Sequence, residues 1–384
     1  MTAFALVGAR VFDGAQLREG EAVIVEGSHI RAVVKEGDVP STVARVPVEG
    51  FLAPGFIDVQ VNGGGGTLLN HEPTVSGVRA IAKAHRRYGT TGLLPTLITD
   101  TRERMAEAIA AVRSAIDAGV PGVLGIHLEG PYLNPERKGV HEASLMRRIE
   151  DEDVALVASL GRGRTLLTLA PERTTPETIR RIAASGVVLA AGHTVASYEE
   201  MMAAKRAGLT GITHLFNAMP PLMGRDPGVV GAALDDADFY PSLIVDLFHV
   251  SAASLRIAIA ARGWERTLLV TDAMSTVGSE LRSFEFNGRT ITRSNGRLTT
   301  ADGTIAGSDL DMATAVRNTV DTLGLPLEAA LHMASRAPAE FLGLGHEFGR
   351  IAPGYRADLV LLDDGLRVRE TWIDGIAGRE DPRQ

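Results

Sequence analysis

The stretch Gly125-Ile126-His127-Leu128-Glu129-Gly130-Pro131 is an apolar run that ends in an acidic residue and is broken at once by glycine and proline. This pattern predicts a buried β-strand, on which His127 and Glu129 share one face because successive side chains alternate. A buried carboxylate is costly unless it is paired, hydrogen-bonded or bound to a metal. Glu129 therefore needs partners, and two later apolar runs end in His193 and His214.

Apolar runs of this kind recur along the chain, separated by segments with helical periodicity. We expect eight of them to be strands, at residues 51–61, 92–99, 123–129, 165–170, 187–193, 211–216, 243–246 and 267–272. Eight strands interleaved with helices favour an α/β fold of the (β/α)₈ type, a TIM-like barrel, whose usual length is about 250 residues. A doubly wound open sheet is the alternative.

Both ends of the chain have a different character. Short β-rich runs with turn signals occupy residues 4–48, and strand patterns return at residues 357–362 and 368–373. We therefore expect both termini to build one small β-sandwich domain. The expected division is a sandwich of residues 1–50 and 345–384, a barrel of residues 51–344 and a β-hairpin inserted near residues 284–303.

The composition is that of a globular protein, with 384 residues, 45% hydrophobic and 22% charged. A net charge of -8 gives no electrostatic reason to expect nucleic acid or a membrane as partner, so the ligand is expected to be small. Cysteine is absent, which leaves His, Asp and Glu for metal chemistry. The first residues lack the pattern of a secretory leader, so we expect a cytoplasmic protein.

Four polar residues end expected strands, and active sites of (β/α)₈ enzymes lie at the C-terminal ends of the strands. These residues are Glu129, His193, His214 and Asp272. One carboxylate and two imidazoles with a fourth position left for water is the composition of a catalytic zinc site. Asp272 would then take a proton from water and later protonate a leaving amine, or else it merely caps the next segment.

Six motifs taken together resemble the amidohydrolase superfamily and, within it, the N-acetylglucosamine-6-phosphate deacetylase family. They are APGFID at 53–58, HLEGP at 127–131, GHT at 192–194, THLFNAM at 213–219, TDA at 271–273 and GRIAPGYRADLV at 349–360. The resemblance runs from about Phe4 to Ile373. It implies hydrolysis of the acetamide of N-acetyl-D-glucosamine 6-phosphate, giving D-glucosamine 6-phosphate and acetate, in amino-sugar catabolism or cell-wall sugar recycling.

The resemblance also implies roles for individual residues. Glu129, His193 and His214 would hold one divalent metal per subunit, with Zn²⁺ expected and Fe²⁺, Mn²⁺ or Co²⁺ as alternatives. Asp272 would be the base, and His141 would polarise the substrate carbonyl unless it is a solvated loop histidine. Substrate contacts are expected from Asn217, Ala218, Arg225, His249, Gln60, Ile305, Ala306 and Gly307.

Arg225 suits a phosphate because its guanidinium donates two parallel hydrogen bonds, although its segment also reads as an exposed turn. The family implies a homodimer in which Arg225 acts across the interface. Gln60 and Asn62 stand where many superfamily members carry histidine ligands of a second metal, so we expect one metal. Gln60 either orients water or substrate or is a structural amide, and His127 is expected behind Glu129.

Two alternatives remain for the function. The substrate can be N-acetylgalactosamine 6-phosphate, because the two sugars differ only in configuration at C4 and no residue visibly distinguishes them. The second alternative belongs to a different class of function: a catalytically silent, amidohydrolase-like protein that binds a sugar or serves as a scaffold. The joint presence of the three expected ligands and Asp272 argues against a silent protein.

Overall fold

Eight parallel strands form the central sheet of the computed structural model, which describes residues 3–381. In chain order they are β8 (Phe56–Val61), β11 (Thr90–Ile98), β12 (Gly125–Glu129), β13 (Arg164–Leu169), β14 (Val188–Ala191), β15 (Gly211–Ile212), β16 (Tyr240–Ile244) and β17 (Leu268–Val270). Each strand pairs with the next one in parallel. Their side chains are mostly buried and apolar, as expected when helices cover the outside of a sheet. The predicted (β/α)₈ barrel is confirmed.

The barrel closes between its last strand and its first, just beyond the end of β17. The backbone N–H of Asp272 donates to the carbonyl of Gln60 at 3.0 Å, and that of Asn62 donates to the carbonyl of Ala273 at 2.9 Å. Val61 also pairs with Ala273 in parallel. This seam holds the residues that follow β17 beside the end of β8.

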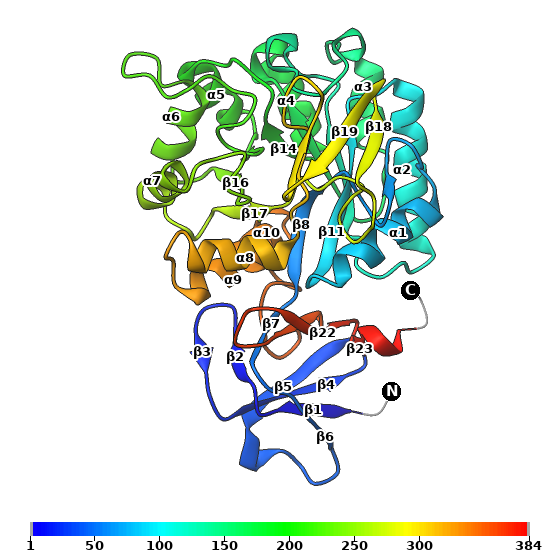
Figure 1. The fold of residues 1–384 in the computed structure, drawn as a ribbon, viewed down its shortest axis with the longest axis vertical. Coiled ribbons are helices and arrows are strands. Elements are labelled where there is room, and N and C mark those ends of the chain that lie inside the picture. Colours follow the sequence, from blue (N-terminus) through cyan, green and yellow to red (C-terminus); the bar gives the residue numbers. More distant parts are fainter. Residues whose placement is uncertain (1–2, 382–384) are drawn as a thin grey trace.

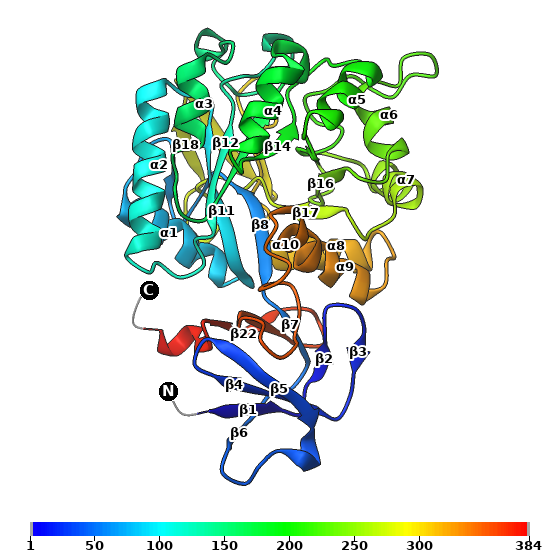
Figure 2. The same ribbon diagram turned by 180° about the vertical axis from the view of Figure 1, so that it is seen from behind.

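Helices surround the sheet in both views (Figures 1 and 2). They are α1 (Val75–Arg86), α2 (Arg102–Asp117), α3 (Asp151–Val157), α4 (Pro176–Ala184), α5 (Tyr198–Arg206), α6 (Gly228–Asp235), α7 (Ala252–Arg262), α8 (Met312–Asp321), α9 (Leu327–Ala334) and α10 (Arg336–Phe341). Most begin at a Ser, Thr or Asp side chain that accepts a backbone N–H, as Thr74 does for α1 and Ser197 for α5. Among residues 3–381, no helix has both the length and the apolar character needed to cross a bilayer.

Two further sheets, built from both ends of the chain, lie below the barrel in Figure 1. The first holds β1 (Phe4–Val7), β4 (Glu21–Glu26), β5 (His29–Lys35) and β6 (Ala44–Pro47), and the second holds β2 (Arg10–Phe12), β3 (Leu17–Arg18), β7 (Phe51–Pro54), β21 (Leu359–Leu362), β22 (Val368–Ile373) and β23 (Ile376–Ala377). Apolar side chains of both sheets share one cluster, with Val23 and Val25 from the first and Leu52 and Leu359 from the second. The predicted small β-sandwich from both termini is confirmed.

Short elements complete the described chain. They are the pair β9 (Gly63–Gly64) and β10 (Thr67–Leu68), and the 3₁₀ turns η1 (Glu36–Asp38), η2 (Pro135–Arg137), η3 (Ala143–Leu145), η4 (Pro171–Arg173) and η5 (Gly378–Glu380).

One expectation about strands is wrong. The run 51–61 is two strands, because the chain leaves the small sheet after β7 and enters the barrel at β8. At Gly55, between them, the backbone passes so close to Thr91 that a Cβ would lie 1.9 Å from its Oγ1. In the segment near 284–303, β18 (Ser283–Phe286) and β19 (Arg289–Ser294) form an antiparallel hairpin, which β20 (Arg297–Thr299) extends to three strands. The domain boundaries at 50/51 and 344/345 stay a prediction.

Candidate metal centre and active site

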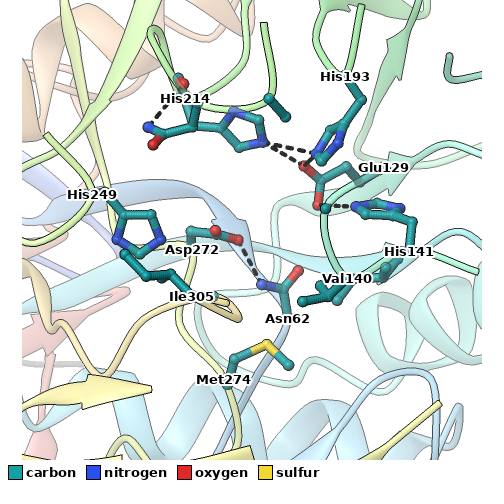
Figure 3. A pocket seen from close by; sticks show the side chains of 15 residues that line it. Asn62, Glu129, Val140, His141, His193, His214, His249, Asp272, Met274 and Ile305 are labelled. Atoms are coloured by element: carbon teal, nitrogen blue, oxygen red, sulfur yellow. Dashed lines mark hydrogen bonds and ion pairs between the residues drawn. The ribbon is translucent and has the colours of Figure 1, made fainter. Parts of the chain in front are cut away.

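The side chains of Glu129, His193 and His214 meet at the C-terminal ends of the barrel strands (Figure 3). The Nε2 atoms of His193 and His214 lie 3.3 and 3.0 Å from Glu129 Oε1, and 3.1 Å from each other. Atoms bonded to one tetrahedral Zn²⁺ at about 2.0–2.2 Å lie roughly 3.3–3.5 Å apart. The three buried donor atoms are therefore spaced much like ligands of a single cation.

The backbone turns sharply where each strand delivers its polar residue. His193, His214 and Asp272 each lie two residues beyond the last residue of β14, β15 and β17. All three have positive φ, at 49°, 34° and 53°. Such left-handed conformations are uncommon outside glycine and concentrate at functional sites. The sharp turns end the strands and leave all three side chains at the mouth of the barrel.

The ring of His193 is oriented from behind. Its Nδ1 donates to the carbonyl of Arg137 at 2.7 Å, which leaves the Nε2 lone pair facing Glu129. His214 Nδ1 is buried and has no hydrogen-bond partner among the described residues, so its Nε2 makes the contacts of that ring. Each histidine thus offers one nitrogen to the same point.

The carboxylate and the imidazoles of this cluster shift one another's pKa values. Burial raises the pKa of Glu129, but hydrogen bonds from His193 and His214 outweigh it and bring that pKa well below its usual value. Burial lowers the pKa of His214, but the hydrogen bond and charge of Glu129 outweigh it and raise that pKa. A divalent cation would compete with a proton for this nitrogen, as at any histidine ligand.

Asp272 lies beside the three donors and is held by two amides. Its Oδ1 accepts hydrogen bonds from Gln60 Nε2 at 3.1 Å and from Asn62 Nδ2 at 2.7 Å. Burial, aided by the charge of Glu129, raises the pKa of Asp272 to about 6. A carboxyl with such a pKa is suited to accept and return a proton near neutral pH.

Gln60 links the two carboxylates and does not line the cavity. The amide nitrogen that donates to Asp272 also donates to Glu129 Oε1 at 3.0 Å. Its side chain is almost completely buried, whereas Asn62 borders the cavity. This placement favours the structural amide over the expected substrate contact.

His141 is buried at the site and is not a solvated loop histidine. Its Nδ1 lies 2.8 Å from Thr99 Oγ1, and its Nε2 lies 3.8 Å from Glu129 Oε2. Its ring centroid is 4.3 Å from that of His193. Burial, with the nearby His193, lowers the pKa of His141 well below its usual range, so the ring is neutral.

A cavity of about 170 Å³ opens above these groups. Of the expected substrate contacts, Asn217, Ala218, His249, Ile305 and Gly307 line it. Ala306 is fully buried, Arg225 lies on the exposed segment 222–226, and neither residue lines the cavity. His249 Nδ1 bonds Asp246 Oδ2 at 2.6 Å, and Figure 3 shows its ring beside Asp272 and Ile305.

Two buried polar residues that contact site residues, Asp58 and Thr99, were not predicted from the sequence. Asp58 accepts the hydroxyl proton of Thr271 at 2.5 Å, and burial raises the pKa of Asp58 to about 7. Thr99 supports His141, and its place at the end of an expected strand was a usable signal. His127 lies behind Glu129 as expected, bonded to Thr168 Oγ1 at 2.8 Å.

Comparison with known proteins agrees with this fold. The model of the amidohydrolase family matches residues 51–377, and that of the NagA composite domain matches residues 3–52. A barrel with a buried Glu/His/His group at its strand ends defines a class of proteins with one architecture and many substrates. The chain belongs to the amidohydrolase family.

Several relatives of the chain are deacetylases of amino-sugar phosphates. N-acetylgalactosamine-6-phosphate deacetylase of Shewanella sp. (strain ANA-3) is 42% identical over 94% of this chain and 95% of its own. N-acetylglucosamine-6-phosphate deacetylase of Haemophilus influenzae is 33% identical over 97% and 98%. The crystal structure of N-acetylglucosamine-6-phosphate deacetylase from Pasteurella multocida superposes with a TM-score of 0.94, at 33% identity over 98% of this chain and 99% of that one.

A second solved structure includes a ligand. It is a mutant N-acetyl-D-glucosamine-6-phosphate deacetylase from Mycobacterium smegmatis in complex with N-acetyl-D-glucosamine-6-phosphate, with a TM-score of 0.91 and 33% identity over 98% of this chain and 100% of that one.

Proposed function

We propose that this protein hydrolyses the acetamide of N-acetyl-D-glucosamine 6-phosphate to D-glucosamine 6-phosphate and acetate, with one divalent metal per subunit. The observation that carries the proposal is the convergence of three donor atoms beside Asp272 in one cavity. The similarity to deacetylases of this substrate over nearly the whole chain supports it.

The donor set fits a divalent cation held by Glu129, His193 and His214. A cation there supplies Lewis acidity, which lowers the pKa of a water molecule and polarises the acetamide carbonyl. Two imidazoles and one carboxylate suit Zn²⁺, with Fe²⁺, Mn²⁺ and Co²⁺ as alternatives. Gln60 and Asn62 donate to Asp272 Oδ1 and are amides rather than the histidines or carboxylates that zinc prefers, which supports one metal.

Asp272 serves as the base and then as the acid. Both amides donate to its Oδ1, so Oδ2 is the oxygen that takes the proton of the attacking water. The protonated carboxyl then gives that proton to the departing amine nitrogen of the sugar. One group thereby completes both proton transfers.

His141 donates a hydrogen bond to the acetamide oxygen as negative charge develops on it. The ring is neutral, so only one of its nitrogens carries a proton. Thr99 Oγ1 is closer to His141 Nδ1, at 2.8 Å, than to the carbonyl of Glu129, at 3.4 Å. We assign the hydroxyl proton to Nδ1, the nearer of these two acceptors, which leaves the ring proton on Nε2, facing the cavity as the donor.

The sugar and its phosphate contact the remaining cavity residues. We assign these contacts to Asn217, Ala218, His249, Ile305 and Gly307, with Ala306 contributing shape from behind. Arg225 lies on an exposed segment and does not line the cavity of its own chain, which supports a homodimer in which it reaches the partner's phosphate site. We further propose a cytoplasmic enzyme, divided into a sandwich of residues 1–50 and 345–384 and a barrel of residues 51–344.

A second substrate is favoured by a specific observation. The relative from Shewanella, at 42% identity, is an N-acetylgalactosamine-6-phosphate deacetylase. The deciding experiment measures acetate release from both hexosamine 6-phosphates and from their unphosphorylated forms, with metal analysis of the same sample. A higher kcat/KM for the galactosamine substrate would transfer the proposal to that sugar. Bound metal without turnover on any of them would instead support a silent sugar-binding or scaffold protein.

A further inference from the structure

The fourth barrel strand, β13, contributes none of the three proposed metal ligands. The turn η4 that follows it carries Glu172, whose carboxylate contacts the residues next to His193. Oε2 of Glu172 accepts the hydroxyl proton of Thr194 at 2.5 Å, and Oε1 accepts the backbone N–H of Val195 at 2.9 Å. The two residues that follow His193 are thus anchored to one carboxylate.

A third donor ties this carboxylate to the loop that follows Glu129. Asn134 Nδ2 donates to Glu172 Oε1 at 3.0 Å, and the backbone N–H of Asn134 donates to the carbonyl of His193 at 2.9 Å. The same loop supplies the carbonyl of Arg137 that accepts the proton of His193 Nδ1. The backbone and the ring of His193 are therefore fixed together.

The conformation that is held in this way is a costly one. His193 has a φ of 49°, and a residue other than glycine in that region persists only where its surroundings enforce it. Hydrogen bonds to an ionised acceptor are stronger than neutral ones, and Glu172 accepts three. Thr194, which is completely buried, also donates its backbone N–H to the carbonyl of Ala218 at 3.3 Å.

We propose that Glu172 is a positioning residue of the metal centre, which acts through Thr194, Val195 and Asn134 to aim His193 Nε2 at the cation. The inference rests on the proposed metal-dependent function, but it concerns metal affinity rather than turnover. Groups that orient metal-bound histidines from behind change affinity by about 10–100-fold when they are removed. Because Thr194 also contacts Ala218, the same carboxylate supports the wall of the substrate cavity.

The test measures Zn²⁺ affinity of the metal-free protein by competition with a chelator, the absorption spectrum of the Co²⁺-loaded protein, and the melting temperature without metal. We expect Glu172→Ala to weaken Zn²⁺ binding about 10–100-fold and to alter the Co²⁺ spectrum. Glu172→Gln keeps the shape without the charge and should fall between this variant and the parent. If the alanine variant does not fold, the glutamine variant and the Thr194 variants decide.

Thr194 provides the conservative rescue. Thr194→Val removes the hydroxyl and should reproduce the loss of affinity, whereas Thr194→Ser keeps it and should bind Zn²⁺ as the parent does. Glu200→Gln is the matched control, because Glu200 accepts the backbone N–H of Ser197 at 2.8 Å as a helix cap. That variant should lower only the melting temperature.

The outcomes separate this inference from the function on which it rests. Folded Glu172→Ala and Thr194→Val proteins with parental affinity and an unchanged Co²⁺ spectrum would overturn the positioning role. A parent that binds no Zn²⁺ or Co²⁺ would overturn the proposed metal centre itself. A parent that binds metal but releases no acetate would overturn the deacetylase function and leave the role of Glu172 standing if its variants lose affinity.

Discussion

The hydroxyl of Thr99 lies 2.8 Å from Nδ1 of His141, with both residues buried at the active site. In the proposed mechanism the hydroxyl donates to Nδ1, which leaves the ring proton on Nε2. We expect Thr99→Val to lower kcat on the order of 10-fold, because Nε2 can then lose its proton to Nδ1 and no longer donate. Zn²⁺ affinity should not change. Thr99→Ser is the control that keeps the hydroxyl, and a valine variant with parental kcat would remove the tautomer argument.

The pH dependence of activity should report Asp272. Burial raises its pKa to about 6, and the carboxyl must be ionised to take a proton from water. The kcat/KM of the parent should therefore fall as the pH drops through about 6. A bound cation stabilises the carboxylate and would move this midpoint to a lower pH. Asp272→Asn should keep the metal, lose roughly 10²–10⁴-fold in kcat and lack this limb of the profile. Near-normal acetate release by that variant would exclude Asp272 as the base.

Removal of the metal should abolish turnover reversibly. Chelator-treated protein is expected to release no acetate and to recover when Zn²⁺, Fe²⁺, Mn²⁺ or Co²⁺ is added, with the extent of recovery ranking the metals. His193→Ala removes one of three ligands and should bind Zn²⁺ much more weakly. His346→Ala is the control, since that side chain is 67% exposed and is not one of the proposed ligands. Parental affinity in His193→Ala would require a different ligand set.

Arg225 should bind the phosphate of the substrate, and it should do so in the active site of the neighbouring subunit. Arg225→Ala is expected to raise KM for the 6-phosphate substrate about 10-fold or more and to leave unphosphorylated substrate unaffected. Mixing this variant with Asp272→Asn tests the geometry. A mixed dimer then holds one site with an intact base and an intact arginine from the other chain, so activity should return. No return in verified mixed dimers would place Arg225 in its own subunit's site.

The end of the chain should contribute to stability without affecting chemistry. Arg86 of α1 and Asp381 form a buried ion pair at 2.7 Å, and Arg86 also donates to Thr371 and Ile376. We expect Asp381→Ala to lower the free energy of unfolding in urea by about 3 kcal/mol, because an unpaired charge stays buried. Arg181→Ala breaks an exposed pair with Asp151 and should cost at most about 1 kcal/mol.

Much of the fold and site followed from the sequence because strand ends are visible there. An apolar run that stops at a single polar residue marks both a strand and the point where it reaches the barrel mouth, as at Glu129 and Asp272. Parallel strands then gather those ends without any knowledge of loops. The same logic covers His193 and His214, although β15 ends at Ile212, earlier than expected, because the chain turns to positive φ at His214.

What the sequence could not reveal depends on contacts between distant segments. Residues 51–61 are apolar apart from Asp58 and Gln60. Pro54-Gly55 signals a break, but it does not show that the strands on its two sides belong to different sheets. Glu172 acts on residues more than twenty positions away, and its own segment resembles an ordinary solvated turn. Gln60 could be read either as a structural amide or as a substrate contact until its amide nitrogen was seen between two carboxylates.

The hydrogen bonds that close the barrel carry a consequence for synthesis of the chain. Glu129, His193 and His214 come from the middle of the sequence, whereas Asp272 is positioned by its backbone bond to Gln60 across the seam. A chain still emerging from the ribosome with its last strand undocked would hold every metal donor but have no base in place. We therefore expect hydrolysis only once the ring is complete, so that recovery of activity during refolding should follow this final closure.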